Sequence, residues 1–202
     1  MPLIGQTIVV SGANTYVAND QLTAINLATT FAPGNKATVI PRYPVWPTIN
    51  RYVNDNGLFS SVSPEYIWDS STTDNQVRAF AVLSGGAPVT LSVTMADFAD
   101  NAHVARIDVY NLSDPSRVFV ETITPPVLVD RSMDANTSLV ETFPYNWQDI
   151  RIYNSTSNLL PGTGIYAILV SFTAVNYLGT TPPITPGNPA GIMFYAHATY
   201  ST

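Results

Sequence analysis

The sequence predicts an all-β fold, an antiparallel β-sandwich of jelly-roll-like type with few short helical turns. Three observations support this class. Apolar and polar residues alternate along many segments, turn-forming residues separate these segments at short intervals, and helical periodicity is weak. A chain of 202 residues can bury a substantial core. We therefore expect one β-sandwich domain over residues 1–202.

The N-terminal part of the chain is less regular than the rest. Residues 1–17 are predicted to form either the first strand of the sandwich or an arm that adds to the sheet of a neighbouring subunit. The proline-rich segment 41–47 is expected to be an ordered, extended connector, because proline lacks the amide donor that a central strand needs. The N-terminal part of the chain is therefore expected to hold few strands for its length.

One segment near the N-terminus is a candidate for a short helix. Residues 20–30 follow Asn19 and Asp20, and either side chain is suited to cap the first turn. The apolar positions expected to face inward are Leu22, Ile25 and Leu27. Several Thr and Asn residues weaken the helical pattern, so we expect one short helix at most.

Residues 77–202 form a dense block of predicted strands. Apolar and polar side chains alternate over 89–95, 106–110 and 150–153, and over 192–199 one set of apolar side chains faces one way while Met193, Tyr195, His197 and Thr199 face the other. The segment 165–174 is apolar at successive positions, which predicts a central strand that is covered on both faces. The proline-rich segment 181–186 is expected to lie in a long hairpin loop between the last two strands.

Charge excludes nucleic acid as a partner. The net charge is −6, the only lysine is Lys36, and the arginines are scattered, so no cationic cluster can displace counterions from phosphates. No stretch of about 18 apolar residues predicts insertion into a membrane. The N-terminus shows no signal peptide. We nevertheless expect an extracellular or surface assembly, because the composition suits contact surfaces.

Side chains that perform catalysis are scarce. The chain has no cysteine and two histidines, His103 and His197, which lack the spacing of a metal-binding motif. No Gly-x-Ser-x-Gly motif is present, and only 11% of residues are charged. The sequence is instead rich in Thr, Ser, Asn, Pro and Tyr, which seldom perform catalysis. We therefore expect a non-enzymatic protein without a transition-metal or organic cofactor.

One acidic group is a candidate calcium site. Asp97, Asp100 and Asn101 are close in sequence, and hard cations bind clustered oxygen atoms of this kind. The spacing is not that of an EF-hand loop. The alternative is that these short side chains cap turns and keep strand ends soluble.

Aromatic residues are the candidate ligand or interface residues. They are Tyr43, Trp46, Trp68, Tyr145 and Trp147. Such rings can form a platform for sugars, can anchor a protein interface, or can simply fill a β core. The sequence leaves these three alternatives open.

These observations favour a structural subunit that assembles with copies of itself into a fibre, an appendage or a shell. An apolar stretch at the chain start is the candidate assembly segment, with Leu3, Ile4, Ile8, Val9 and Val10 as its apolar residues. The first alternative is a carbohydrate-binding module or lectin that binds glycans through loop aromatics. The second is a viral jelly-roll capsid protein.

Overall fold

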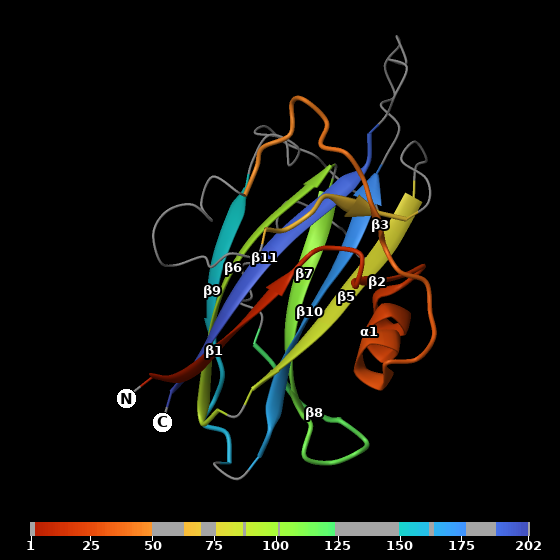
Figure 1. The fold of residues 1–202 in the computed structure, drawn as a ribbon. Coiled ribbons are helices and arrows are strands. Elements are labelled where there is room, and N and C mark those ends of the chain that lie inside the picture. The colour runs from red at the N-terminus through yellow and green to blue at the C-terminus, as the bar shows by residue number, and fades with distance from the viewer. Residues whose placement is uncertain are drawn as a thin grey trace.

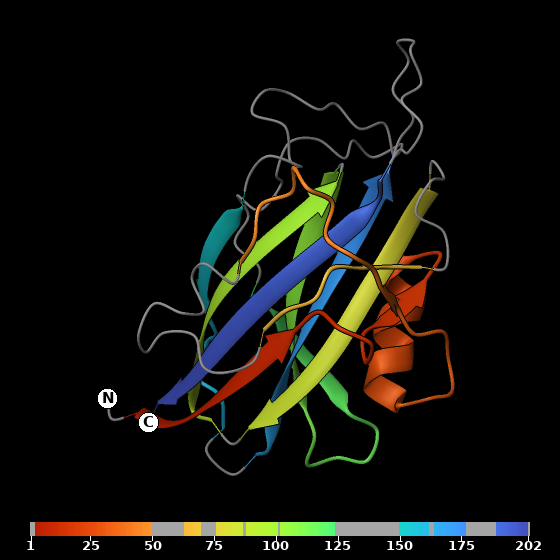
Figure 2. The same cartoon turned by 45° about the horizontal axis from the view of Figure 1, so that its top comes forward.

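Two antiparallel β-sheets pack face to face in a computed structural model of the chain (Figure 1). The structure describes residues 3–49, 63–69, 76–86, 88–100, 102–123, 150–161, 164–176 and 189–201. We call the two layers sheet A and sheet B. The N- and C-termini lie side by side at one end of the sandwich, because the first strand pairs with the last (Figures 1 and 2).

Sheet A has the strand order β3-β4-β11-β6-β9, and β1 also pairs with β11. Its strands are β1 (Leu3–Val10), β3 (Thr38–Val39), β4 (Ile67–Trp68), β6 (Thr90–Asp100), β9 (Arg151–Thr156) and β11 (Gly191–Ser201). The sheet is built around β11 and β6, which are paired over their full length.

Sheet B has the strand order β2-β5-β10-β7-β8. Its strands are β2 (Tyr16–Ala18), β5 (Gln76–Gly86), β7 (Ala102–Asn111), β8 (Val118–Thr122) and β10 (Tyr166–Asn176). Without the three shortest strands, β1-β11-β6-β9 faces β5-β10-β7-β8. Successive strands from β5 to β7 alternate between the sheets, and the last strands return beside the first, as in an eight-stranded jelly roll. The predicted fold class is confirmed.

The segment 165–174 was predicted to be a central, doubly covered strand; β10 confirms this from Tyr166 onward, whereas Ile165 precedes the strand and is exposed. β10 lies between β5 and β7. On its inner face Ile168, Val170 and Phe172 are buried in the core between the sheets. On its outer face Leu169 is buried in a second apolar cluster beneath the helix. Both faces are apolar because each contacts a different layer.

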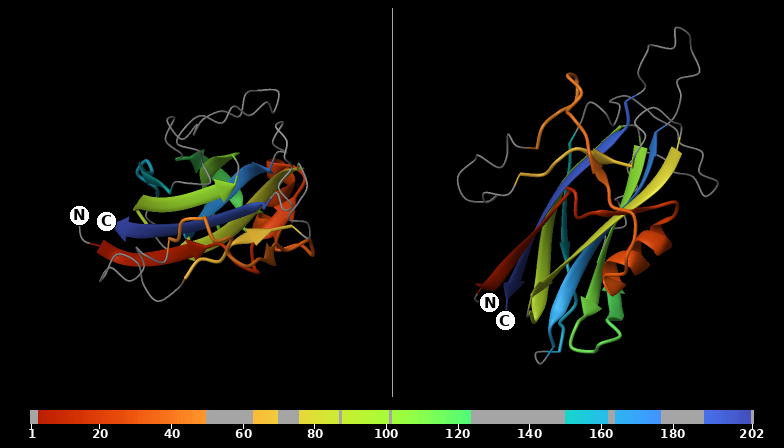
Figure 3. Two further views of the ribbon diagram at one scale, coloured as in Figure 1. Left: turned by 90° about the horizontal axis from the view of Figure 1, so that it is seen from above. Right: turned by 45° about the vertical axis from the view of Figure 1, so that its right-hand side comes forward.

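The predicted helix is present as α1 (Gln21–Thr30), which covers the outer face of sheet B (Figures 1 and 3). Asp20 caps it, because the carboxylate accepts a hydrogen bond of 2.8 Å from the amide of Thr23. Ile25 faces sheet B as expected. The inward prediction for Leu22 is wrong: its side chain is exposed, because only one side of this short helix touches the sheet.

The connector 41–47 covers part of the outer face of sheet A. It is ordered but not extended throughout, since the amide of Trp46 donates to the carbonyl of Tyr43 and closes a turn. The indole of Trp46 then packs on Phe98 of β6, with ring centroids 5.4 Å apart. The outer face of β6 is thereby covered by a loop, whereas the outer face of β10 is covered by a helix.

The N-terminal segment forms an ordinary first strand in this chain. β1 pairs antiparallel with β11, from Leu3 opposite Ser201 to Val10 opposite Tyr195. Val9 is buried in the core, and Ile8 packs partly against it. Residues 3–10 are thus a strand of sheet A in this chain, and residues 1 and 2 lie outside the described residues. A role of Leu3, Ile4 and their neighbours in assembly stays a prediction.

Candidate functional site

A groove lies on the outer face of sheet B, and both polar and apolar side chains line it. Alternation along β7 directs Ile107 and Val109 into the core, and it directs Arg106, Asp108 and Tyr110 to the outer face. The helix α1 borders this face on one side and the edge strand β8 borders it on the other. We call this recess the sheet B groove.

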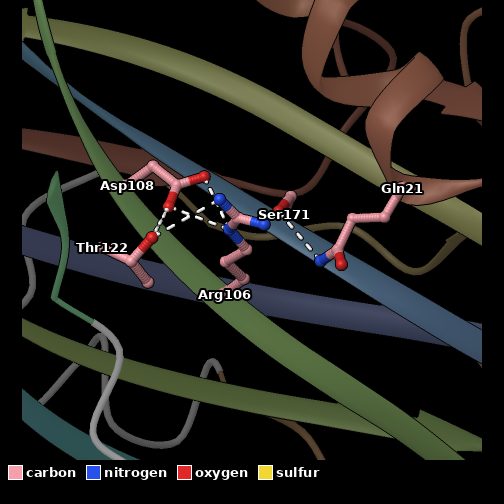
Figure 4. Close-up of polar contacts among 5 residues, drawn as sticks. All are labelled: Gln21, Arg106, Asp108, Thr122 and Ser171. Atoms are coloured by element: carbon pink, nitrogen blue, oxygen red, sulfur yellow. Dashed lines mark hydrogen bonds and ion pairs between the residues drawn. The ribbon is translucent and has the colours of Figure 1, made fainter. Parts of the chain in front are cut away.

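An ion pair lies on the floor of the sheet B groove (Figure 4). The Arg106 Nε atom is 2.9 Å from each carboxylate oxygen of Asp108. Asp108 is fully buried and also accepts a hydrogen bond of 2.6 Å from the hydroxyl of Thr122 on β8. The side chain of Arg106 is 41% exposed. One edge of the guanidinium is therefore fixed by Asp108, while the rest of the group faces solvent.

The helix contributes an amide group to the same face. Gln21, the first residue of α1, donates a hydrogen bond of 3.0 Å from Nε2 to the hydroxyl of Ser171 on β10 (Figure 4). This bond fixes the side chain of Gln21 over the sheet. Its carbonyl oxygen remains as a hydrogen-bond acceptor beside the groove.

The remaining wall of the groove is aromatic and aliphatic. The ring of Phe119 on β8 meets the ring of Tyr110 edge to face, with centroids 5.9 Å apart and an angle of 76° between the planes. The cavity measures about 380 Å³ and is lined by Gln21, Leu22, Ile25, Arg106, Tyr110 and Phe119. This combination of an apolar lining with a few fixed polar groups is typical of small-molecule sites.

Tyr110 keeps its phenolic proton at neutral pH. Burial raises the pKa of Tyr110, and the negative charge of Asp108 raises it further, although the nearby Arg106 acts in the opposite direction. The phenol is therefore a neutral hydroxyl that can donate or accept a hydrogen bond at the edge of the groove.

Two of the three predicted calcium ligands, Asp97 and Asp100, are directed to opposite faces of sheet A. Asp97 lies on the inner face of β6, where one carboxylate oxygen is 2.9 Å from Nε2 of His103. Asp100, three residues later, accepts a hydrogen bond of 2.8 Å from the indole of Trp46. An odd spacing along a strand places two side chains on opposite faces. Asn101 lies outside the described residues, and no group of three potential metal ligands occurs among the described ones.

Two of the five predicted platform aromatics are part of the core. Trp46 is 1% exposed and Trp68 is 0% exposed, so neither ring is accessible to a ligand in this chain. Tyr43 is exposed, and its ring is tilted against that of Trp46, with centroids 5.9 Å apart and an angle of 54° between the planes. Tyr145 and Trp147 lie outside the described residues. For the two buried tryptophans, core packing is the alternative that the structure supports.

Sequence analysis missed the residues of the sheet B groove as a group. The alternation at 106–110 placed Arg106, Asp108 and Tyr110 on one face of a strand. Nothing local indicated that Gln21 or Phe119 would lie beside them. The run Val118-Phe119-Val120 was a possible signal, because three consecutive apolar residues next to a turn are unusual at an exposed strand.

A second recess lies beside β2 on the other side of α1. It measures about 400 Å³, and its polar lining includes Asn19, Asn35, Lys36, Asp69 and Arg78. Arg78 forms an ion pair with Asp69, and the ammonium of Lys36 lies over the ring of Tyr16. Its charged groups are therefore already engaged with neighbouring side chains.

Comparisons with known proteins do not identify a family. No family model and no curated protein matches the chain. Among solved structures, the chain is similar to TmCBM61 in complex with β-1,4-galactotriose, at 9% identity and a TM-score of 0.35, covering 99% of this chain and 90% of that one. It is also similar to the VP2 subviral particle of infectious bursal disease virus, at 13% identity and a TM-score of 0.33.

That second match covers 98% of this chain and 56% of the viral chain, so the chain spans little more than half of it. A third similar structure is the cleaved adhesin domain of Lys-gingipain from Porphyromonas gingivalis, at 16% identity and a TM-score of 0.31. It covers 79% of this chain and 93% of that one. Likeness at this level assigns no function. Within the described ranges, no helix is long and apolar enough to cross a membrane.

Proposed function

We propose that this protein is a non-enzymatic structural subunit that assembles with copies of itself, at a surface or outside the cell, into a fibre, an appendage or a shell. The observation that carries the proposal is the edge strand β8. Three consecutive apolar side chains on this strand are exposed: Val118 by 48%, Phe119 by 47% and Val120 by 38%. The occupant that we propose for this edge is a second copy of the chain.

An apolar edge strand favours pairing between subunits. Among the described strands, β8 pairs only with β7, so on its other side it presents amide and carbonyl groups to a partner strand. Soluble proteins usually protect such an edge with lysine, proline or a bulge that turns it away. Lysine is absent from β8, and so is proline, although a register shift at Val120 interrupts its pairing with β7. Strand addition by a second copy would satisfy the backbone groups and cover the valines.

The described polar groups favour a structural role over a catalytic one. The buried pair Asp97 and His103 has side chains that are 0% and 1% exposed, so a substrate cannot reach either. Asp108 is likewise buried against Arg106. The jelly-roll strand order suits both a shell and a fibre, and fold alone does not choose between them.

The test is the oligomeric state of the protein and of one edge variant. Val120→Lys places a charge on the β8 edge, where a partner strand would have to bury it. Val39→Lys is the matched control, because Val39 is similarly exposed, at 42%, on the short strand β3 of sheet A. We would measure mass by light scattering and inspect particles by negative-stain microscopy.

We expect oligomers or ordered particles from the unmodified chain and from Val39→Lys. We expect a folded monomer from Val120→Lys, with a melting temperature close to that of the unmodified protein. A monomeric unmodified protein at high concentration would overturn the proposal. So would a Val120→Lys variant that assembles as well as its parent.

A further inference from the structure

We propose that the sheet B groove binds a neutral oligosaccharide. This inference does not rest on the proposed assembly, although Phe119 of β8 contributes both to the groove and to the apolar edge. The ring of Phe119 and the side chain of Leu22 supply the apolar part, and Gln21, Arg106 and Tyr110 supply the polar part. The volume of about 380 Å³ is in the range of small-molecule sites.

The polar groups match the hydroxyl groups of a sugar. Arg106 bonds Asp108 through Nε and the hydroxyl of Thr122 through Nη2; in the described part of the chain, Nη1 makes no hydrogen bond. Gln21 donates to Ser171 and keeps its carbonyl oxygen as an acceptor. A sugar hydroxyl both donates and accepts, so one ring can satisfy Arg106 and Gln21 together.

The apolar groups match the other part of a sugar ring. A pyranose carries C–H groups on its faces and hydroxyl groups around its rim. The ring of Phe119 is half exposed, and its edge-to-face contact with Tyr110 fixes its orientation at the side of the groove. A sugar face can pack against this ring while the rim contacts the floor. Fixed aromatic contacts of this kind cost little conformational entropy.

The charge balance favours a neutral ligand. Asp108 lies against the guanidinium of Arg106, so the two formal charges on the groove floor offset each other. An anionic ligand would compete with a buried carboxylate for the same arginine. A cationic ligand would approach the exposed guanidinium and be repelled by it.

The backbone of the groove floor disfavours a peptide ligand. β7 is paired with β10 on one side and with β8 on the other, and β10 is itself paired with β5. An extended peptide gains affinity from the free backbone groups of a strand edge. The floor strands offer no such edge, so a ligand in the groove is recognised by side chains.

The test is a titration monitored by amide chemical shifts, with cellotriose, mannotriose, galactotriose and chitotriose as probes and trigalacturonate as the anionic counterpart. The Val120→Lys protein is used beside the unmodified chain, so that assembly does not obscure the spectra. We expect at least one neutral probe to shift amides around Gln21, Arg106 and Phe119. The acidic probe is expected to bind more weakly.

Two variants test the two halves of the site. Phe119→Ala removes the ring and Gln21→Ala removes the amide, and we expect each to weaken binding at least about tenfold. Arg106 is left intact, because its loss would leave the carboxylate of Asp108 buried without a partner. The control is Tyr43→Ala, an exposed aromatic outside the groove. A melting curve for each variant shows that the fold is retained.

Three results would overturn the inference. The first is that no neutral probe shifts the groove amides. The second is that binding survives in Phe119→Ala and Gln21→Ala, and the third is a preference for the acidic probe. Since the oligomeric state is measured separately, a failure here leaves the proposed assembly unaffected, and the reverse also holds.

Discussion

The two lateral sides of the sandwich differ in how their strand edges are covered. On one side β1 of sheet A contacts β5 of sheet B, and the hydroxyls of Thr7 and Ser84 hydrogen-bond across the two sheets. Val9 on this side is 3% exposed. On the other side β8 and β9 are the edges, and their apolar residues Val120 and Ile152 are exposed. We call these the closed side and the open side.

The hydrogen bond that links the sheets on the open side is exposed, unlike the part-buried one on the closed side. There the carboxylate of Glu121 accepts a hydrogen bond of 3.0 Å from the amide of Asn158, and both groups are near solvent. A solvent-exposed polar contact adds little stability, whereas a strand that covers apolar groups adds much. The closed side therefore contributes more to the stability of the subunit, whereas apolar residues stay exposed on the described part of the open side.

The largest expected effect comes from deleting residues 1–12, which removes β1 from the closed side. This exposes the edge of β11 and the apolar groups that Val9 covers. We expect the free energy of unfolding to fall by about 3 kcal/mol or more. Urea denaturation and light scattering measure the loss and the accompanying aggregation. A soluble, truncated monomer with near-normal melting would show instead that this segment is an arm.

A smaller effect is expected from Thr7→Val, which removes the hydroxyl that meets Ser84 between the sheets. We expect a loss of about 1 kcal/mol, the usual net contribution of one part-buried hydrogen bond. Thr94→Val is the matched control, because its hydrogen bond of 2.7 Å to Asn154 joins β6 and β9 at the exposed surface. Equal losses in the two variants would contradict the difference between the sides.

Glu121→Gln on the open side should change stability by less than about 0.5 kcal/mol. The substituted amide keeps one oxygen that can accept from the backbone amide of Asn158, and it loses only the exposed hydrogen bond that Nδ2 of Asn158 donates to the other carboxylate oxygen. Thermal unfolding of the variant and its parent at low and high salt would measure this change in stability. A loss above about 1 kcal/mol would show that this contact holds the two sheets together on the open side.

The smallest expected effect is a pH dependence at His197, which lies in β11 beside β1. Burial lowers the pKa of His197 from the usual 6.5, and its Nε2 is 3.0 Å from Oε1 of Gln6. The folded state therefore binds the proton more weakly than the unfolded state. The contribution of neutral His197 to the free energy of unfolding is therefore complete above pH 6.5, and it is lost as the pH falls through the lowered pKa of the folded state. Melting curves between pH 7.5 and 5.5 should show a weaker decline for His197→Gln.

Particular segments show how far the fold could be predicted. The apolar residues on both faces of 165–174 were sufficient to predict a central strand, because only a doubly covered strand tolerates them. What covers the outer face could not be predicted. The helix α1 does so, although it lies far away in sequence, and its exposed Leu22 shows that a short helix need not bury every apolar position.

The candidate site could be predicted only in part. The outward face of β7 was visible in the alternation of Arg106, Asp108 and Tyr110. The placement of Trp46 was not, since a tryptophan in a proline-rich connector suits a platform as well as a core. Its burial against β6 depends on the path of the connector across sheet A.

Local sequence was enough to predict the long strands of residues 77–202, the short capped helix, the sandwich class and the scarcity of catalytic groups. Each depends on residue type or on a period of two residues, and both are local properties. Only the tertiary structure decided that β1 pairs with β11, that Gln21 and Phe119 border the same groove, and that β8 is left as an edge. These depend on which distant segments become neighbours, because strand pairing is set by the burial of the whole core and not by any one segment.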